Sequence, residues 1–124
     1  DGNGNACRHS IEEIAPGDKF LIVAYRPFSS RQPYAEQGPI FLHADECTAY
    51  DGIDRLPGMY NARDGLLLRG YGSDERIVYG TGQTVAPENA ESTAQEIMAT
   101  EGVSYVHVRS ATNNCYQFRI EPVT

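Results

Sequence analysis

The chain has 124 residues, enough for one domain with a buried core, and its seventeen acidic and ten basic side chains give a net charge of -7. This acidity argues against a nucleic-acid partner and against binding to an anionic membrane, because both require a basic surface. Nine of the ten basic residues are Arg, the exception being Lys19, so a local site for a small anion is still compatible with the overall charge.

Two strands are predicted in the first half of a single domain that spans 1–124 and has a flexible start over 1–6. A short helical turn is expected over 10–14, before a Pro-Gly pair. Residues 19–28 (KFLIVAYRPF) are apolar on both faces, which predicts a buried central strand. Residues 39–43 form a second strand, and 44–63 lack periodicity and are expected to be irregular.

One helix is predicted, over 87–100. Pro87 suits the first helical position, and an apolar stripe follows at helical spacing, made of Ala90, Ala94, Ile97 and Met98. Gly102 suits the end of the helix, because glycine readily adopts the left-handed backbone found there.

The remaining strands are predicted to form two hairpins. Their ranges are 65–71, 75–79, 103–110 and 115–121. Strands that follow one another along the chain, with one helix among them, predict an α+β fold: an antiparallel or mixed sheet with one main helix packed on one face.

The last two strands carry polar residues on one face. Side chains alternate along a strand, so His107 and Arg109 lie opposite Val106 and Val108. We predict the register that keeps apolar partners together, which gives the pairs Val106–Phe118, His107–Gln117, Val108–Tyr116 and Arg109–Cys115. The resulting polar face consists of Tyr105, His107, Arg109, Cys115, Gln117 and Arg119.

The candidate functional residues come from this polar face and its loop, with Arg8 near the N-terminus and Arg69 and Tyr71 on an earlier strand as additions. His107 and Cys115 are the candidate catalytic residues, because an imidazole and a thiol can perform acid–base or thiol chemistry. The candidate ligand-binding residues are Arg8, Arg69, Tyr71, Arg109, Asn113 and Arg119, in which guanidinium groups would hold a small anion. A solvated face of an antiparallel sheet would show the same alternation. Because free Cys is usually buried, Cys115 suggests that 44–63 or a second subunit covers the face.

The three cysteines, Cys7, Cys47 and Cys115, are far apart in the sequence. Their odd number and the lack of a CxxC pair argue against a disulfide framework and favour the reducing cytoplasm. Four zinc ligands could come from His43, Cys47, His107 and Cys115, but the spacing matches no standard zinc finger, so no metal and no cofactor are predicted. The longest apolar run is strand-sized, so no membrane span is expected.

Several segments resemble a bacterial family of uncharacterised proteins, the domain-of-unknown-function family numbered twelve hundred and three. The similarity covers Cys7 to Glu121 and includes Cys7-Arg8, the GPIFLH segment over 38–43, Arg69-Gly70-Tyr71 and HVRSATNNC over 107–115. In that last segment, Ser110 replaces an Asn of the family pattern and Asn114 replaces a Gly. The resemblance implies a small cytoplasmic bacterial protein and implies no particular activity.

Three functions remain open at this stage. The first is a binding module or small cofactor-free enzyme that acts on a small anionic ligand at the polar face. The second is a non-catalytic interaction protein that forms a homodimer through the polar face or through the hairpin over 65–79. The third is a thiol or zinc site built from the cysteines with His43 and His107.

Overall fold

The computed structural model describes residues 6–47 and 57–122. The strands are β1 (Phe20–Tyr25), β2 (Gly38–His43), β3 (Leu66–Tyr71), β4 (Gln83–Val85), β5 (Tyr105–Ser110) and β6 (Tyr116–Ile120). The helical segments are the 3-10 turns η1 (Gly58–Ala62) and η2 (Pro87–Asn89) and the α-helix α1 (Ala90–Met98). No helix in the described ranges is long and apolar enough to cross a lipid bilayer.

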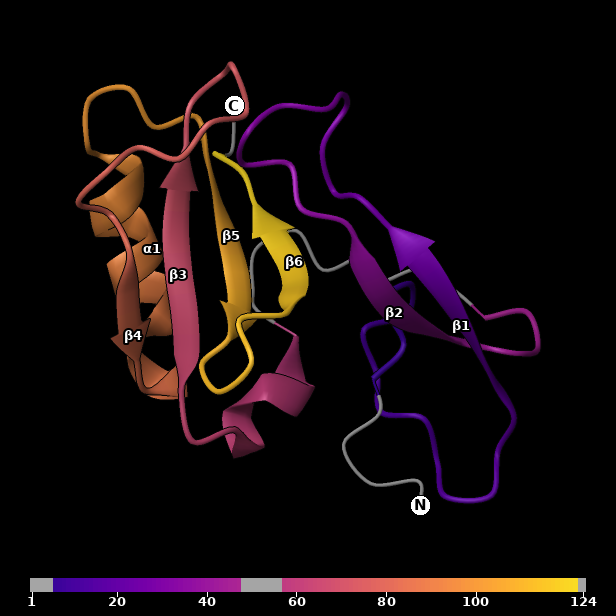
Figure 1. The fold of residues 1–124 in the computed structure, drawn as a ribbon. Coiled ribbons are helices and arrows are strands. Elements are labelled where there is room, and N and C mark those ends of the chain that lie inside the picture. Colours follow the sequence, from indigo (N-terminus) through magenta and orange to yellow (C-terminus); the bar gives the residue numbers. More distant parts are fainter. Residues whose placement is uncertain (1–5, 48–56, 123–124) are drawn as a thin grey trace.

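The strands form two antiparallel sheets. β4, β3, β5 and β6 form a four-stranded sheet in that order, and β1 pairs only with β2. Helix α1 covers one face of the larger sheet, and the β1–β2 pair lies beyond its β6 edge (Figure 1). The predicted α+β fold with one main helix on one face of a sheet is therefore confirmed.

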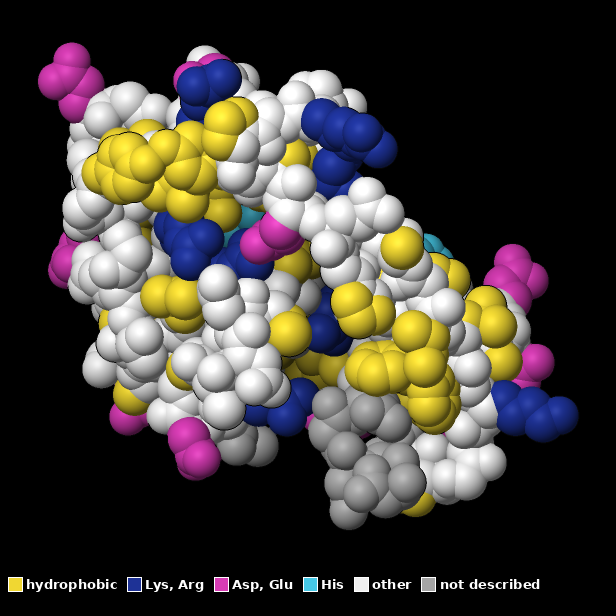
Figure 2. All heavy atoms as spheres, viewed as in Figure 1, with side chains coloured by type: hydrophobic (Ala, Val, Ile, Leu, Met, Phe, Trp, Pro, Cys, Tyr) yellow, Lys and Arg dark blue, Asp and Glu magenta, His cyan; other side chains and the backbone are white. Residues whose placement is uncertain are grey.

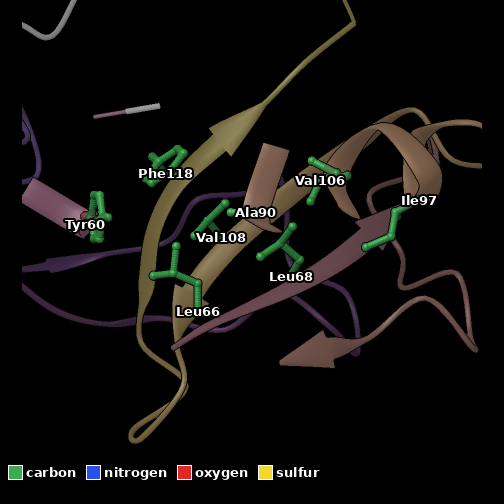
Figure 3. Packing of buried hydrophobic residues seen from close by; sticks show 9 residues of the cluster. Tyr60, Leu66, Leu68, Ala90, Ile97, Val106, Val108 and Phe118 are labelled. Carbon is green, nitrogen blue, oxygen red and sulfur yellow. The ribbon is translucent and has the colours of Figure 1, made fainter. Parts of the chain in front are cut away.

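The core lies between α1 and the four-stranded sheet (Figure 3). It consists of Tyr60, Leu66, Leu68, Ala90, Ala94, Ile97, Val106, Val108 and Phe118. The predicted helix stripe is confirmed, with Met98 at its partly buried edge. A Cβ atom on Gly70 would lie 2.9 Å from Cγ2 of Ile97, so the absence of a side chain on β3 lets the helix approach the sheet closely.

Two predicted elements in the first half are wrong. Strand β1 is exposed along its whole length rather than buried, and Ile22 retains 63% of its accessible surface. It is an edge strand of a two-stranded sheet. Apolar residues on both faces of a strand do not distinguish this position from a buried central one. The predicted helical turn over 10–14 is an irregular turn, in which Ile11 has a φ of 54°.

The predicted strand over 75–79 is also wrong. The antiparallel partner of β3 on this side is β4, and Ile77 forms only an isolated bridge with Tyr71. The hydroxyl of Thr81 accepts a hydrogen bond from Gly70 N at 2.9 Å and donates one to Val78 O at 2.6 Å. A side chain therefore takes the place of a backbone partner at the end of β3.

The predicted register of the last hairpin needs a correction of two residues. Phe118 pairs with Val108 and Arg119 pairs with His107, and a bulge then places Tyr116 opposite Arg109. The extra residue of the bulge is Gln117, whose side-chain oxygen accepts a hydrogen bond from the Tyr60 hydroxyl at 2.9 Å. The bulge therefore removes Gln117 from the predicted polar face and adds Tyr116 to it.

Candidate functional site

Three basic side chains form a row across the four-stranded sheet, on the face opposite α1. Arg69 on β3 and Arg119 on β6 are the direct cross-strand partners of His107 on β5. Direct partners have Cβ atoms about 5 Å apart, so the side chains of this row adjoin one another. Figure 2 shows basic and acidic side chains together in a hollow on this side of the molecule.

The segment 26–37, which connects β1 to β2, lies over this row, and we call it the covering loop. Its Phe28 ring lies 5.2 Å from the His107 ring, and its Glu36 carboxylate accepts a hydrogen bond from Nη2 of Arg109. Nη2 of Arg119 donates to the carbonyl of Pro27 at 3.3 Å. This loop, rather than 44–63 or a second subunit, covers His107 and Arg109, whereas Cys115, from which a cover was predicted, is exposed. Residues 48–56 of the expected cover lie outside the described part of the chain.

Arg109 is 1% exposed and is held from two directions. Its Nε donates to the side-chain oxygen of Asn114 at 2.6 Å, and its Nη2 donates to the Asn114 carbonyl at 2.8 Å. Asn114 can present both oxygens because its φ of 57° turns the backbone back toward β5. Nη1 of Arg109 and Oε1 of Glu36 are buried and have no hydrogen-bond partner among the described residues.

His107 is completely buried in an aromatic cage. Its ring centroid lies 4.6 Å from that of Tyr71, 5.1 Å from Tyr105 and 4.8 Å from Tyr116. Neither ring nitrogen has a hydrogen-bond partner in the described structure. Burial, reinforced by the charges of Arg119, Arg109 and Arg69, lowers the pKa of His107 to about 3. The imidazole is thus neutral at pH 7, with one nitrogen able to donate and the other able to accept.

The candidate residues fall into two groups. Arg69, Tyr71, His107, Arg109 and Arg119 lie on one face, on which Tyr71, His107 and Arg109 are buried, Arg69 is half-buried and Arg119 is exposed. Arg8 reaches the edge of this face, where its Nε donates to the Tyr116 carbonyl at 2.9 Å. Cys115 and Asn113 are exposed in the hairpin loop, where the Cys115 thiol lies 3.7 Å from the Asn113 carbonyl. The candidate catalytic pair, His107 and Cys115, is therefore not assembled around one buried centre.

Four residues of the site were missed: Phe28, Glu36, Asn114 and Tyr116. Asn114 is adjacent to the predicted Asn113, and only the geometry of the loop decides between them. The bulge that brings in Tyr116 leaves no clear mark in the alternation pattern. Glu36 is 73 residues from its partner Arg109, a separation that no local pattern can bridge.

A second cluster of chemically reactive side chains lies outside the polar face. The ligand atoms of Cys7, His43 and Cys47 all lie within 4.8 Å of one another. Nδ1 of His9 lies 3.3 Å from the Cys47 sulfur. Burial raises the pKa of the Cys7 thiol, but hydrogen bonds from Ser10 and from neighbouring backbone amides outweigh it and lower that pKa to about 6.

Both clusters involve segments of the chain that carry the family resemblance. The family model described as protein of unknown function (DUF1203) matches residues 4–122. The chain belongs to the DUF1203 family. No curated protein and no solved structure matches the chain. The DUF1203 match therefore establishes a family without an assigned activity, and the function has to be argued from the two clusters.

Proposed function

We propose that this DUF1203 protein binds a small organic carboxylate between the Arg69–His107–Arg119 row and the covering loop. The observation that carries the proposal is a set of buried polar atoms that have no partner among the described residues: both nitrogens of His107, the Tyr105 hydroxyl, Nη1 of Arg109 and Oε1 of Glu36. Each such group costs about 1–3 kcal/mol when it is left unpaired. Native proteins rarely tolerate several together unless a functional site requires them.

The chemistry of the site favours an anion. Arg69 and Arg119 flank the neutral His107, and Arg109 lies one step along the same strand face. In the described part of the chain, Arg109 pairs with one acidic side chain, that of Glu36, which comes from the covering loop and is 38% exposed. Planar guanidinium groups match carboxylates through paired hydrogen bonds.

Glu36 marks the position where a ligand carboxylate would bind. It uses one oxygen on Nη2 of Arg109, while its second oxygen and Nη1 of Arg109 remain unpaired. A free carboxylate can accept hydrogen bonds from Nη1 and Nη2 of Arg109 together, which the tethered Glu36 side chain does not, and displacement would return the Glu36 carboxylate to solvent. We infer that the ligand displaces Glu36 and that the covering loop moves to admit it.

The walls of the site favour an organic body on the ligand rather than a bare inorganic ion. The rings of Tyr71 and Tyr105 are stacked, with centroids 5.4 Å apart, and Phe28 packs against Tyr71 at the same centroid distance. Such rings bury an apolar or aromatic group well. Since His107 is neutral, its part in this proposal is to donate or accept a hydrogen bond.

The test is a calorimetric titration with benzoate, acetate and inorganic phosphate. We expect benzoate to bind more tightly than acetate, and both to bind more tightly than phosphate. Arg69→Ala should weaken benzoate binding about tenfold, because a hydrogen bond to a charged group contributes about 1.5 kcal/mol or more. Glu36→Gln should strengthen it several-fold, because it removes the competing carboxylate.

Arg31→Ala is the matched control, since it removes the same charge from an exposed position on the covering loop. Equal losses in the Arg31 and Arg69 variants would reduce the effect to overall charge and refute the site. Preferential binding of phosphate would refute the carboxylate as the ligand class. No detectable binding of any probe, to the wild type or to the Glu36 variant, would refute the proposal itself.

A further inference from the structure

A set of sulfur and nitrogen ligands converges next to β2, away from the polar face. Cys7 and His9 belong to the turn at 6–10, His43 is the last residue of β2, and Cys47 follows four residues later. The turn is fixed to the strand, because Arg8 N donates to Phe41 O at 2.9 Å and Cys7 forms a bridge with Phe41. Backbone pairing therefore holds ligands that are 40 residues apart in the sequence close together.

Two of the distances between donor atoms match the edges of a tetrahedron around a metal ion. The sulfurs of Cys7 and Cys47 are 3.8 Å apart, and Nδ1 of His9 is 3.3 Å from the Cys47 sulfur. Two sulfurs at about 2.3 Å from a tetrahedral zinc lie about 3.8 Å apart, and a sulfur and a nitrogen lie slightly closer. The donor atom of His43 lies within 4.8 Å of both sulfurs.

A second layer of contacts orients these ligands. The Ser10 hydroxyl lies 3.4 Å from Nδ1 of His43, and the Ser10 amide donates to the Cys7 sulfur at 3.5 Å. Ser10 is 6% exposed and touches two members of the set. Metal-binding imidazoles are commonly held in this way by a polar group on the ring nitrogen that does not bind the ion.

The surroundings also provide access for an ion. An open recess of about 440 Å³ adjoins the cluster and is lined in part by His43, Asp45 and Cys47. Cys7 is fully buried, whereas His43 and Cys47 are half-buried and His9 is exposed. The set therefore combines a buried ligand, Cys7, with an exposed ligand, His9. This arrangement lets an ion enter from the recess.

We propose that Cys7, His43 and Cys47 bind one zinc ion, with Nδ1 of His9 as the fourth ligand. Two thiolates and two neutral imidazoles form a ligand set that zinc prefers. Two thiolate charges balance the charge of the ion, so the loaded site adds no net charge to the interior. This set shares only His43 and Cys47 with the four ligands considered from the sequence, because His107 and Cys115 lie elsewhere.

The test measures metal content and coordination in the full chain purified under reducing conditions. We expect one zinc per chain by mass spectrometry of the metal. Replacement of zinc by Co²⁺ should give the visible bands of a tetrahedral site and a near-ultraviolet thiolate charge-transfer band. Cys47→Ser should abolish that band and reduce the zinc content to background. His9→Ala should weaken zinc affinity at least about tenfold, since even outer-shell partners change affinity by that factor.

Cys115→Ser is the matched control, because it removes an exposed thiol that lies outside the cluster. It should leave the zinc content and the Co²⁺ spectrum unchanged. Circular dichroism of each variant separates loss of the ligand from loss of the fold. Three results would overturn the proposal: no zinc in the reduced wild type, a Co²⁺ complex without a thiolate band, or a folded Cys47 variant that retains the metal.

Discussion

The buried His107 predicts a specific loss of stability in acid. Its pKa is about 3 in the folded chain, against about 6.5 in an unfolded one. The unfolded state therefore binds more protons between these two values, and the free energy of unfolding falls as the pH is lowered through that window. The stability contributed by neutral His107 is fully present above about pH 6.5 and decreases toward pH 3.

The magnitude follows from the two pKa values. Lowering the pH from 7 to 5 should reduce the free energy of unfolding by about 2 kcal/mol through His107 alone. Three arginines, Arg69, Arg109 and Arg119, face this imidazole and oppose its protonation, and the Glu36 carboxylate is already paired with Arg109. Among the residues that the structure describes, no further acidic side chain is therefore positioned to stabilise the imidazolium.

The assay is urea unfolding at pH 7 and pH 5, followed by far-ultraviolet circular dichroism because the chain has no Trp. His107→Phe removes the titrating group from the aromatic cage and should show about 2 kcal/mol less pH dependence than the wild type. Equal pH dependence in the wild type and the Phe variant would refute the claim that His107 is neutral because it is buried.

Three further predictions concern the fold, the covering loop and the exposed strand. Gly70→Ala should lower the free energy of unfolding, measured by urea denaturation, by about 1–3 kcal/mol, because its Cβ would lie 2.9 Å from Ile97. Gly58→Ala is the control and should change the free energy of unfolding little, because its Cβ would have no atom within 4 Å. Glu75→Ala removes a carboxylate that accepts two hydrogen bonds from the covering loop, so amide hydrogen exchange of that loop should become faster with no change at α1. Ile22→Lys should reduce concentration-dependent light scattering, because β1 is an exposed apolar edge strand (Figure 2) that favours pairing with a second copy; unchanged scattering would argue against self-association through β1.

The sequence predicted those parts of the fold that depend on local periodicity. Alternation on β5 placed His107 and Arg109 on one face, and helical spacing placed Ala94 and Ile97 in the core. The predictions were wrong where one local sequence pattern is compatible with two different structures. Apolar residues on both faces of a strand fit a buried centre, yet β1 has them at an exposed edge.

The polar-face site could be predicted from the sequence better than the cluster around Cys7, because strand alternation identifies part of it. Alternation alone placed His107 and Arg119 on one face even though the register was wrong by two residues, whereas Arg69 joins them through the pairing of β3 with β5, which was not predicted. A shift of two preserves the face of each side chain, so the set changed only where the bulge exchanged Gln117 for Tyr116 and where Cys115 lies in the hairpin loop. Glu36 could not be found, because it comes from a loop with no periodicity.

The cluster of Cys7, His9, His43 and Cys47 shows most clearly which contacts cannot be predicted from spacing along the sequence. The Cys7 and Cys47 sulfurs lie 3.8 Å apart although 40 residues separate them in the sequence. Their proximity depends on the pairing of the N-terminal turn with Phe41 of β2, a contact that neither segment predicts by itself. Arg8 extends this turn to the polar face, because its Nε bonds to the Tyr116 carbonyl beside the His107 cage. The N-terminal turn thus contacts both clusters, and a ligand set that fixes it would also fix one edge of the proposed carboxylate site.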